Sequence, residues 1–134
     1  MTVQLTKDSI DLGIVTRNPG PMLEFYRDTL GFDFQGEMAI PGGGNMLRLL
    51  CGTSLIKIVT PGNLSAADAP AGGIGGAAGY RYWTISVSNL DALTQKCADA
   101  GAKVAVKPTE IRPGVRIAMV EDPDGNWLEF LQTE

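Results

Sequence analysis

The chain has no histidine and only two cysteines among its 134 residues. Histidine is the commonest general base and the commonest transition-metal ligand in proteins, so other side chains must fill both roles here. Cys51 and Cys97 are too few for a disulfide framework. Because no secretory signal is visible, we expect them to be free, buried thiols.

Long apolar runs and basic blocks are also missing. No apolar run approaches the length of a bilayer-spanning helix, and residues 1–11 carry no basic segment followed by an apolar one. We therefore expect a cytoplasmic protein with no membrane partner. The net charge of −4 and the absence of a basic block argue against nucleic acid as a partner. A hydrophobic share of 44% is typical of a globular domain with a core.

What the sequence does contain is a repeat. Asn18 to Gly31 and Asn89 to Gly101 both predict a helix, with a capping asparagine at the start and a glycine at the exit. The apolar stripe of the first is Leu23, Tyr26 and Leu30. The strands that we expect around these helices are Ile10–Thr16, Phe32–Met38, Met46–Cys51 and Leu55–Thr60, then Tyr82–Ser88, Lys103–Lys107, Val115–Glu121 and Trp127–Gln132.

Both halves therefore follow the order strand, helix, strand, strand, strand. We predict an α+β fold of one domain, residues 1–134, built from two βαβββ modules. Module one covers about 8–60 and module two about 80–132. The stretch from 61 to 79 is rich in glycine and alanine, which indicates a flexible connector.

The end of the chain combines a turn with an unusual strand. Residues 122–126 read Asp-Pro-Asp-Gly-Asn, a turn sequence. Strand alternation then places Trp127, Glu129 and Leu131 on one face. A carboxylate between apolar neighbours indicates a side chain that points into an enclosed site. The alternative is an ordinary hairpin with an exposed glutamate.

These features resemble the vicinal oxygen chelate superfamily, which includes glyoxalase I, bleomycin-resistance proteins and extradiol dioxygenases. The resemblance lies in the two modules, in the turn at 122–126 followed by Glu129, and in the residues 25–32, Phe-Tyr-Arg-Asp-Thr-Leu-Gly-Phe. It implies that the modules form a curved, cup-like mixed sheet with helices outside. It also implies a homodimer.

In that family the cup usually holds a divalent metal, bound by the first and last strands of each module. The matching positions here are Asp11, Lys57, Tyr82 and Glu129, where metal-binding relatives commonly have histidine and glutamate. A lysine ammonium cannot coordinate a cation and repels it. We therefore expect no cofactor and a Lys57 paired with Asp11 and Glu129. The alternative is that Asp11 and Glu129 hold a hard cation such as Mg²⁺.

The rest of the cup wall is expected to bind a ligand. Trp127 and Tyr82 could stack on a flat molecule, with Leu55, Leu131 and Lys57 around it. Arg48 and Arg116 occupy what the repeat suggests are matching places in the third strands. They would bind an anionic group or, as we favour, lie at a solvated edge.

Three functions remain open at this level. The first is metal-free binding of a small, mostly apolar or aromatic organic molecule, as in a resistance protein. The second is a metal-free isomerase or lyase with Asp11 or Glu129 as base and Tyr82 or Lys57 as acid. The third is a metal-dependent lyase or dioxygenase.

Overall fold

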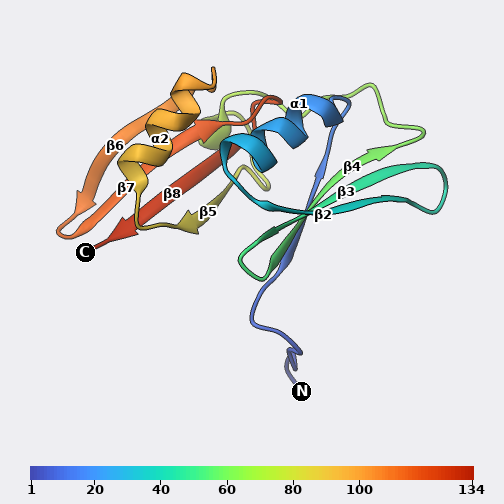
Figure 1. The fold of residues 1–134 in the computed structure, drawn as a ribbon, viewed down its shortest axis with the longest axis horizontal. Coiled ribbons are helices and arrows are strands. Elements are labelled where there is room, and N and C mark those ends of the chain that lie inside the picture. Colours follow the sequence, from blue (N-terminus) through green and yellow to red (C-terminus); the bar gives the residue numbers. More distant parts are fainter. The chain divides into compact units, whose positions relative to one another are not determined.

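The computed structural model describes residues 1–134, which divide into two compact units, Met1–Ser65 and Ala66–Glu134 (Figure 1). In the first unit the strands are β1 (Asp11–Val15), β2 (Asp33–Ala39), β3 (Gly44–Cys51) and β4 (Ser54–Pro61), with the helices α1 (Pro19–Leu23) and η1 (Glu24–Thr29) after β1. Their order in the sheet is β1-β4-β3-β2, and only β1 and β4 are parallel.

The second unit repeats this arrangement. Its elements are η2 (Gly73–Gly75), β5 (Tyr82–Ser86), α2 (Leu90–Asp99), β6 (Val104–Arg112), β7 (Val115–Glu121) and β8 (Trp127–Thr133). The sheet order is β5-β8-β7-β6, with β5 parallel to β8. The predicted α+β fold with two βαβββ modules is confirmed.

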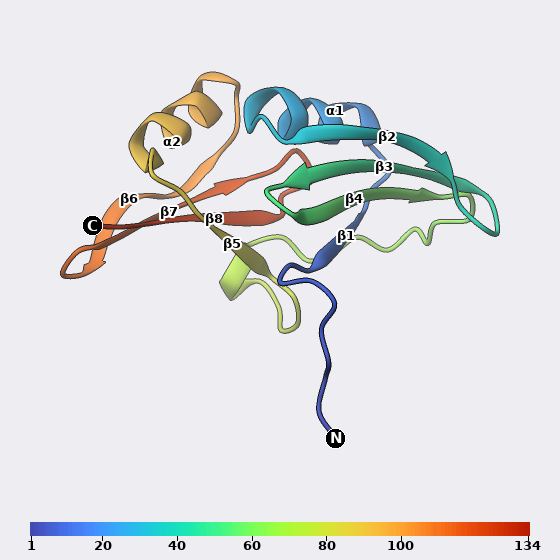
Figure 2. The same ribbon diagram turned by 60° about the horizontal axis from the view of Figure 1, so that its bottom comes forward.

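The helices cover one face of each sheet. Figure 2 shows α1 and η1 over the first sheet and α2 over the second. Strand residues on these covered faces are buried, among them Leu49, Ile56 and Ile58 in the first unit and Leu128 and Phe130 in the second. The opposite face of each sheet, which we call the open face, carries the predicted site residues.

The first helix differs from its prediction. After α1 the chain continues as a π-helix, in which Leu30 N–H donates to the Phe25 carbonyl. The buried residues still recur at helical spacing, but their stripe is offset from the expected one. Met22, Phe25 and Tyr26 are buried, whereas only Tyr26 of the expected stripe Leu23, Tyr26 and Leu30 is.

The strand β6 is longer than predicted. We expected it to end at Lys107, but it continues to Arg112. Pro108 does not stop it, because β6 is the edge strand of its sheet and its register shifts between Val106 and Thr109. Proline is tolerated at edges and bulges, where its missing N–H costs no ladder hydrogen bond.

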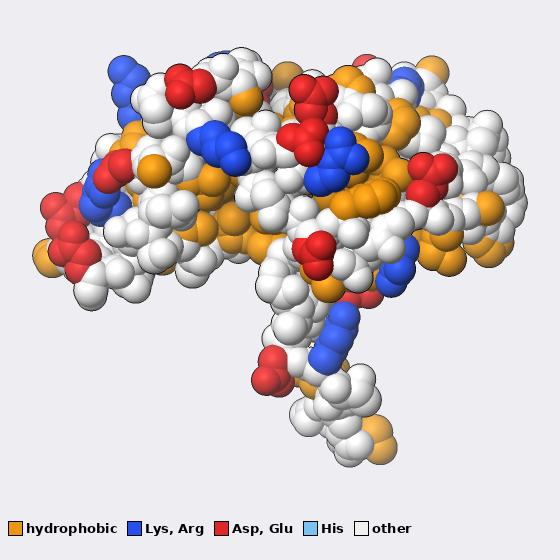
Figure 3. Space-filling view, in the orientation of Figure 1, with side chains coloured by type: hydrophobic (Ala, Val, Ile, Leu, Met, Phe, Trp, Pro, Cys, Tyr) orange, Lys and Arg blue, Asp and Glu red, His pale blue; other side chains and the backbone are white.

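No helix is long and apolar enough to cross a membrane. On the face shown in Figure 3, charged side chains of both signs are interspersed, and hydrophobic atoms are exposed between them.

Candidate functional site

The predicted site positions lie side by side within each unit. In the first unit, Gly13 of β1 pairs with Lys57 of β4, and Asp11 precedes Gly13 by two residues on the same face. In the second unit, Thr84 of β5 pairs with Glu129 of β8. The two registers match, so Asp11 corresponds to Tyr82 and Lys57 to Glu129, as the repeat predicts.

Asp11 is held by two ammonium groups. Lys7 Nζ lies 2.6 Å from Asp11 Oδ1, and Lys57 Nζ lies 3.4 Å from Asp11 Oδ2. The hydrogen bond from Lys7, helped by Lys57, lowers the pKa of the Asp11 carboxyl. The side chains of Asp11 and Lys57 are each about one-third exposed, at 34% and 32%. The carboxylate is thus neutralised locally and is a weak base.

Glu129 has a different partner. The Thr84 hydroxyl donates to Glu129 Oε1 at 2.7 Å. In the neighbouring row of the open face, Tyr82 pairs with Trp127. The predicted common face of Trp127, Glu129 and Leu131 is confirmed by this register. Tyr82 is 50% exposed, which leaves much of its ring available to a ligand.

Trp127 is packed against the connector. A Cβ placed on Gly73 would lie 2.0 Å from the Trp127 ring, so only glycine fits this close approach. Arg81 fixes the same segment by donating at 2.6 Å to the carbonyls of both Gly73 and Pro70. The indole N–H donates at 3.1 Å to Glu121. Part of the predicted flexible connector therefore has a defined conformation, and one surface of Trp127 is occupied.

Arg48 and Arg116 do not occupy matching places. Arg48 pairs with Lys57 on the open face, whereas the residue paired with Glu129 is Met119. Arg116 lies three residues before Met119 in β7 and pairs with Gln132 instead. The prediction was wrong because a shared place in the order of strands does not fix the register of a residue within its hairpin.

Arg116 has a structural role on the helix-covered face. Its guanidinium forms two hydrogen bonds of 2.8 and 2.7 Å with the carboxylate of Asp91, in the first turn of α2. The Arg116 guanidinium lowers the pKa of the Asp91 carboxyl. Gln132 accepts a hydrogen bond of 2.9 Å from Leu90 N–H, so both side chains tie the start of α2 to the sheet.

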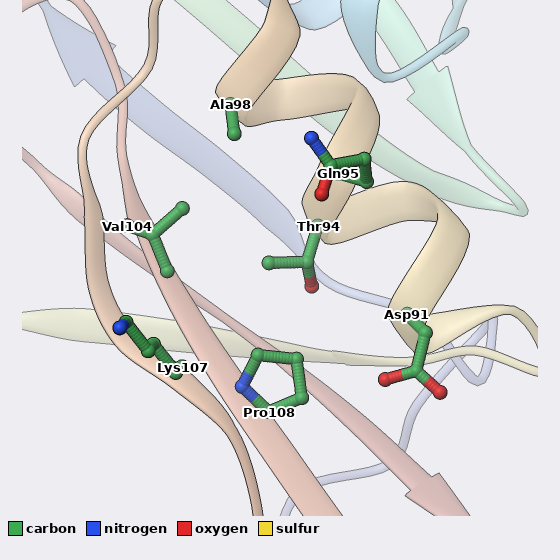
Figure 4. Close-up of a pocket in the computed structure, with 7 residues that line it drawn as sticks. All are labelled: Asp91, Thr94, Gln95, Ala98, Val104, Lys107 and Pro108. Atoms are coloured by element: carbon green, nitrogen blue, oxygen red, sulfur yellow. The ribbon is translucent and has the colours of Figure 1, made fainter.

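Two cavities lie in the second unit. One of about 350 Å³ lies between α2 and β6 and contains none of the predicted site residues (Figure 4). It is lined by Asp91, Thr94, Gln95, Ala98, Val104, Lys107 and Pro108. The other, of about 390 Å³, is lined by Tyr82 together with Ile74, Tyr80, Arg81 and residues 77–79. Its volume suits a small organic molecule.

The residues at the family's metal positions do not fit a metal. Divalent cations such as Mg²⁺ or Ca²⁺ need several oxygen ligands, and transition metals favour imidazole or thiolate. Each unit offers one carboxylate at these positions, and that of Asp11 is engaged by Lys7 and Lys57. No group of three histidine, cysteine, aspartate or glutamate side chains is placed to hold a metal ion.

Several residues of the site were missed from the sequence. Lys7 and Gly13 belong to segments already considered, but nothing in their local pattern marks them. Thr84 could have been found by carrying the alternation of the strand two residues past Tyr82. Gly73 had no such signal, because its role depends on a contact with Trp127 over 50 residues away.

Solved structures confirm the fold. A glyoxalase family protein from Bacillus cereus matches with a TM-score of 0.83 at 15% identity, covering 98% of this chain and 96% of that chain. A glyoxalase/bleomycin resistance protein from Streptomyces sp. CB03234 matches with a TM-score of 0.67 at 19% identity, covering 92% of this chain and 98% of that chain. A glyoxalase I mutant from Zea mays matches with a TM-score of 0.73 at 16% identity, and the match covers 90% of this chain but 43% of that chain. At these identities the likeness concerns the fold alone.

No curated protein matches the sequence. The family model described as "Glyoxalase/Bleomycin resistance protein/Dioxygenase superfamily" matches residues 9–130, which is most of the chain. The two βαβββ modules, with the same order of strands in each sheet, agree with this match. The chain therefore belongs to the glyoxalase/bleomycin resistance/dioxygenase superfamily.

Proposed function

We propose that this protein binds a small, mostly apolar or aromatic organic molecule on the open faces of its sheets, without a metal. The observation that carries the proposal is the pairing of Asp11 with Lys7 and Lys57. Lys57 stands at a position where, as the family resemblance implies, metal-binding relatives have a ligand, and Lys7 adds a second ammonium group beside Asp11. A function that needs no metal is the one that this set of side chains supports best.

The surroundings of these charges support an organic ligand. Leu55 and Val59 flank Lys57 on β4, and Trp127 and Leu131 flank Glu129 on β8. All four side chains are half-buried. Half-exposed Tyr82 also lines the cavity of about 390 Å³. Apolar walls with a few oriented polar groups are the usual composition of a small-molecule site.

A thermal-shift screen tests this proposal. Untagged protein is divided into two samples, one treated with a chelator, and both are screened against a library of small aromatic and aliphatic compounds. Binding at a hundredfold excess over Kd adds about 2.7 kcal/mol of stability, enough for a clear shift. We expect the same hits with and without chelator. Hits that vanish after chelation, or a library without hits, would contradict the proposal.

A metal-free isomerase or lyase is the second candidate. The observation in its favour is the hydrogen bond from Thr84, which orients the Glu129 carboxylate on the open face. A general base contributes about 10²-fold or more to turnover, so Glu129→Gln separates the two functions. A binding protein shows no turnover and a modest change of affinity, whereas an enzyme loses turnover by that factor.

We also propose that the protein is a homodimer, as the family resemblance implies. Light scattering during size-exclusion chromatography measures its mass in solution, which should be twice the 14.2 kDa of one chain. A monomeric mass at micromolar concentration would contradict this.

A further inference from the structure

The open face of the first unit carries a row of two cations between two glycines. Arg48 of β3 lies directly across from Lys57 of β4. On the outer strands, Gly13 pairs with Lys57 and Gly36 pairs with Arg48. The row across the four strands is therefore Gly13, Lys57, Arg48 and Gly36. A Cβ placed on either glycine would meet no atom within 4 Å, so both ends of the row are open.

The two cations are incompletely neutralised. Lys57 shares Asp11 with Lys7, and the half-buried Arg48 side chain makes no hydrogen bond or ion pair. Directly opposite side chains in an antiparallel pair lie about 5 Å apart at Cβ, where like charges repel. In a chain of net charge −4, this face nevertheless carries three cations, Lys7, Lys57 and Arg48, against two carboxylates, Asp11 and Asp33. An anion placed between Arg48 and Lys57 would remove the repulsion.

An apolar row lies beside the cationic one. Val15 pairs with Val59, Val59 with Met46, and Met46 with Met38, all on the open face. Val15 and Met38 are 56% and 50% exposed. Two residues along a strand span about 7 Å, so the apolar row begins roughly that far from the cations. That distance corresponds to a chain of a few carbon atoms.

We infer that Arg48 and Lys57 form an anion subsite for the carboxylate of a small organic ligand, whose apolar part lies on Val15, Val59, Met46 and Met38. The planar guanidinium of Arg48 presents a fork that matches a carboxylate, and Lys57 adds a point charge. This inference rests on the proposed function and specifies its ligand as an amphiphilic organic anion.

The test compares three probes of one shape: 4-phenylbutanoate, the neutral 4-phenylbutan-1-ol and the cationic 4-phenylbutylamine. Each is titrated into ¹⁵N- and methyl-labelled protein while NMR follows Arg48 Nε–H and the Met38 and Met46 methyl groups. We expect 4-phenylbutanoate to shift these signals with saturation and to bind about tenfold tighter than the alcohol, since charge-assisted hydrogen bonds form only with the carboxylate. The amine should bind weakest.

Arg48→Met and Arg48→Gln should each remove the preference for the carboxylate, and both should fold, because they relieve the repulsion from Lys57. Arg116→Met is the matched control, since Arg116 pairs with Asp91 on the other face of its own sheet. It should keep the preference.

Equal affinity for the carboxylate and the alcohol would overturn the inference and leave the proposed function intact. So would probes that move only signals of residues 66–134, or an Arg48→Gln variant that binds 4-phenylbutanoate like the wild type. If no probe binds and the compound library gives no thermal shift, the inference and the proposed function both fail.

Discussion

The Thr84 hydroxyl donates a hydrogen bond of 2.7 Å to Glu129 across the parallel strands β5 and β8. Thr84→Val removes the donor but keeps the shape of the side chain. We expect a loss of about 0.5–1.5 kcal/mol in the free energy of unfolding, measured by urea denaturation. Thr84→Ser keeps the hydroxyl and should stay near the wild type. If the valine variant is as stable as the serine variant, the hydrogen bond is not formed in solution.

Lys57→Met should change the urea midpoint little. Asp11 keeps its shorter contact with Lys7, and the loss of the Lys57 ammonium removes the like-charge neighbour of Arg48. Lys57→Arg, which retains the repulsion, is the control and should be no more stable than the methionine variant. A large loss of stability in Lys57→Met would show that Lys57 has an important partner besides Asp11.

The repeat made most of the fold predictable from sequence. Strand alternation is a local signal, and it located β7 (Val115–Glu121) at its observed bounds and β8 (Trp127–Thr133) to within one residue. The predicted capping asparagines, Asn18 and Asn89, do stand at the starts of the helices, but neither makes a side-chain capping hydrogen bond. The errors arose where local signals were overruled by neighbours. The strand that was expected to end at Lys107 continues past Pro108, because an edge strand accepts proline. The π-helical turn of Glu24–Thr29 has no simple sequence signature.

The sequence predicted which positions form the candidate site, but it did not predict which side chains contact one another there. The family motif located Asp11, Lys57, Tyr82 and Glu129 on matching strands. It did not identify the partner of each charge, because that depends on register and on residues outside the motif. Lys7 was missed for this reason, and the proposed match of Arg48 with Arg116 failed through register alone.

Gly73→Ala should disturb the packing of the connector on Trp127. The new Cβ would lie 2.0 Å from the indole ring, and the residue has a positive φ of 55°. We expect destabilisation of about 1–3 kcal/mol and a red shift of tryptophan fluorescence as Trp127 becomes more exposed. Gly75→Ala, in the same turn but with nothing within 4 Å, is the control. If both variants resemble the wild type, the contact with Trp127 is absent in solution.

Cys97 predicts a pH dependence of stability. Burial raises the pKa of its thiol from 9.0 to about 11. The unfolded chain ionises this thiol first, so the folded state binds more protons between these values. Stability is therefore full below pH 9 and falls as the pH rises towards 11, by at most about 3 kcal/mol.

The comparison with Cys97→Ala isolates this contribution. The variant should be less stable at pH 7 because it leaves a cavity, but the difference between the two proteins should narrow from pH 9 to 11. Urea denaturation at a series of pH values measures it. A constant difference across the window would show that the Cys97 thiol ionises as readily in the folded state as in the unfolded one.

The central claim is that the lysines beside Asp11 replace the metal of this family, and elemental analysis after metal loading tests it most directly. Untagged protein is incubated with Zn²⁺, Ni²⁺, Mn²⁺ or Fe²⁺, dialysed and analysed by mass spectrometry. We expect less than about 0.1 ion per chain, because no unit offers a set of uncharged or anionic ligands that completes a coordination sphere. Retention of about one ion per chain, lost on replacing Asp11 or Glu129, would contradict the account.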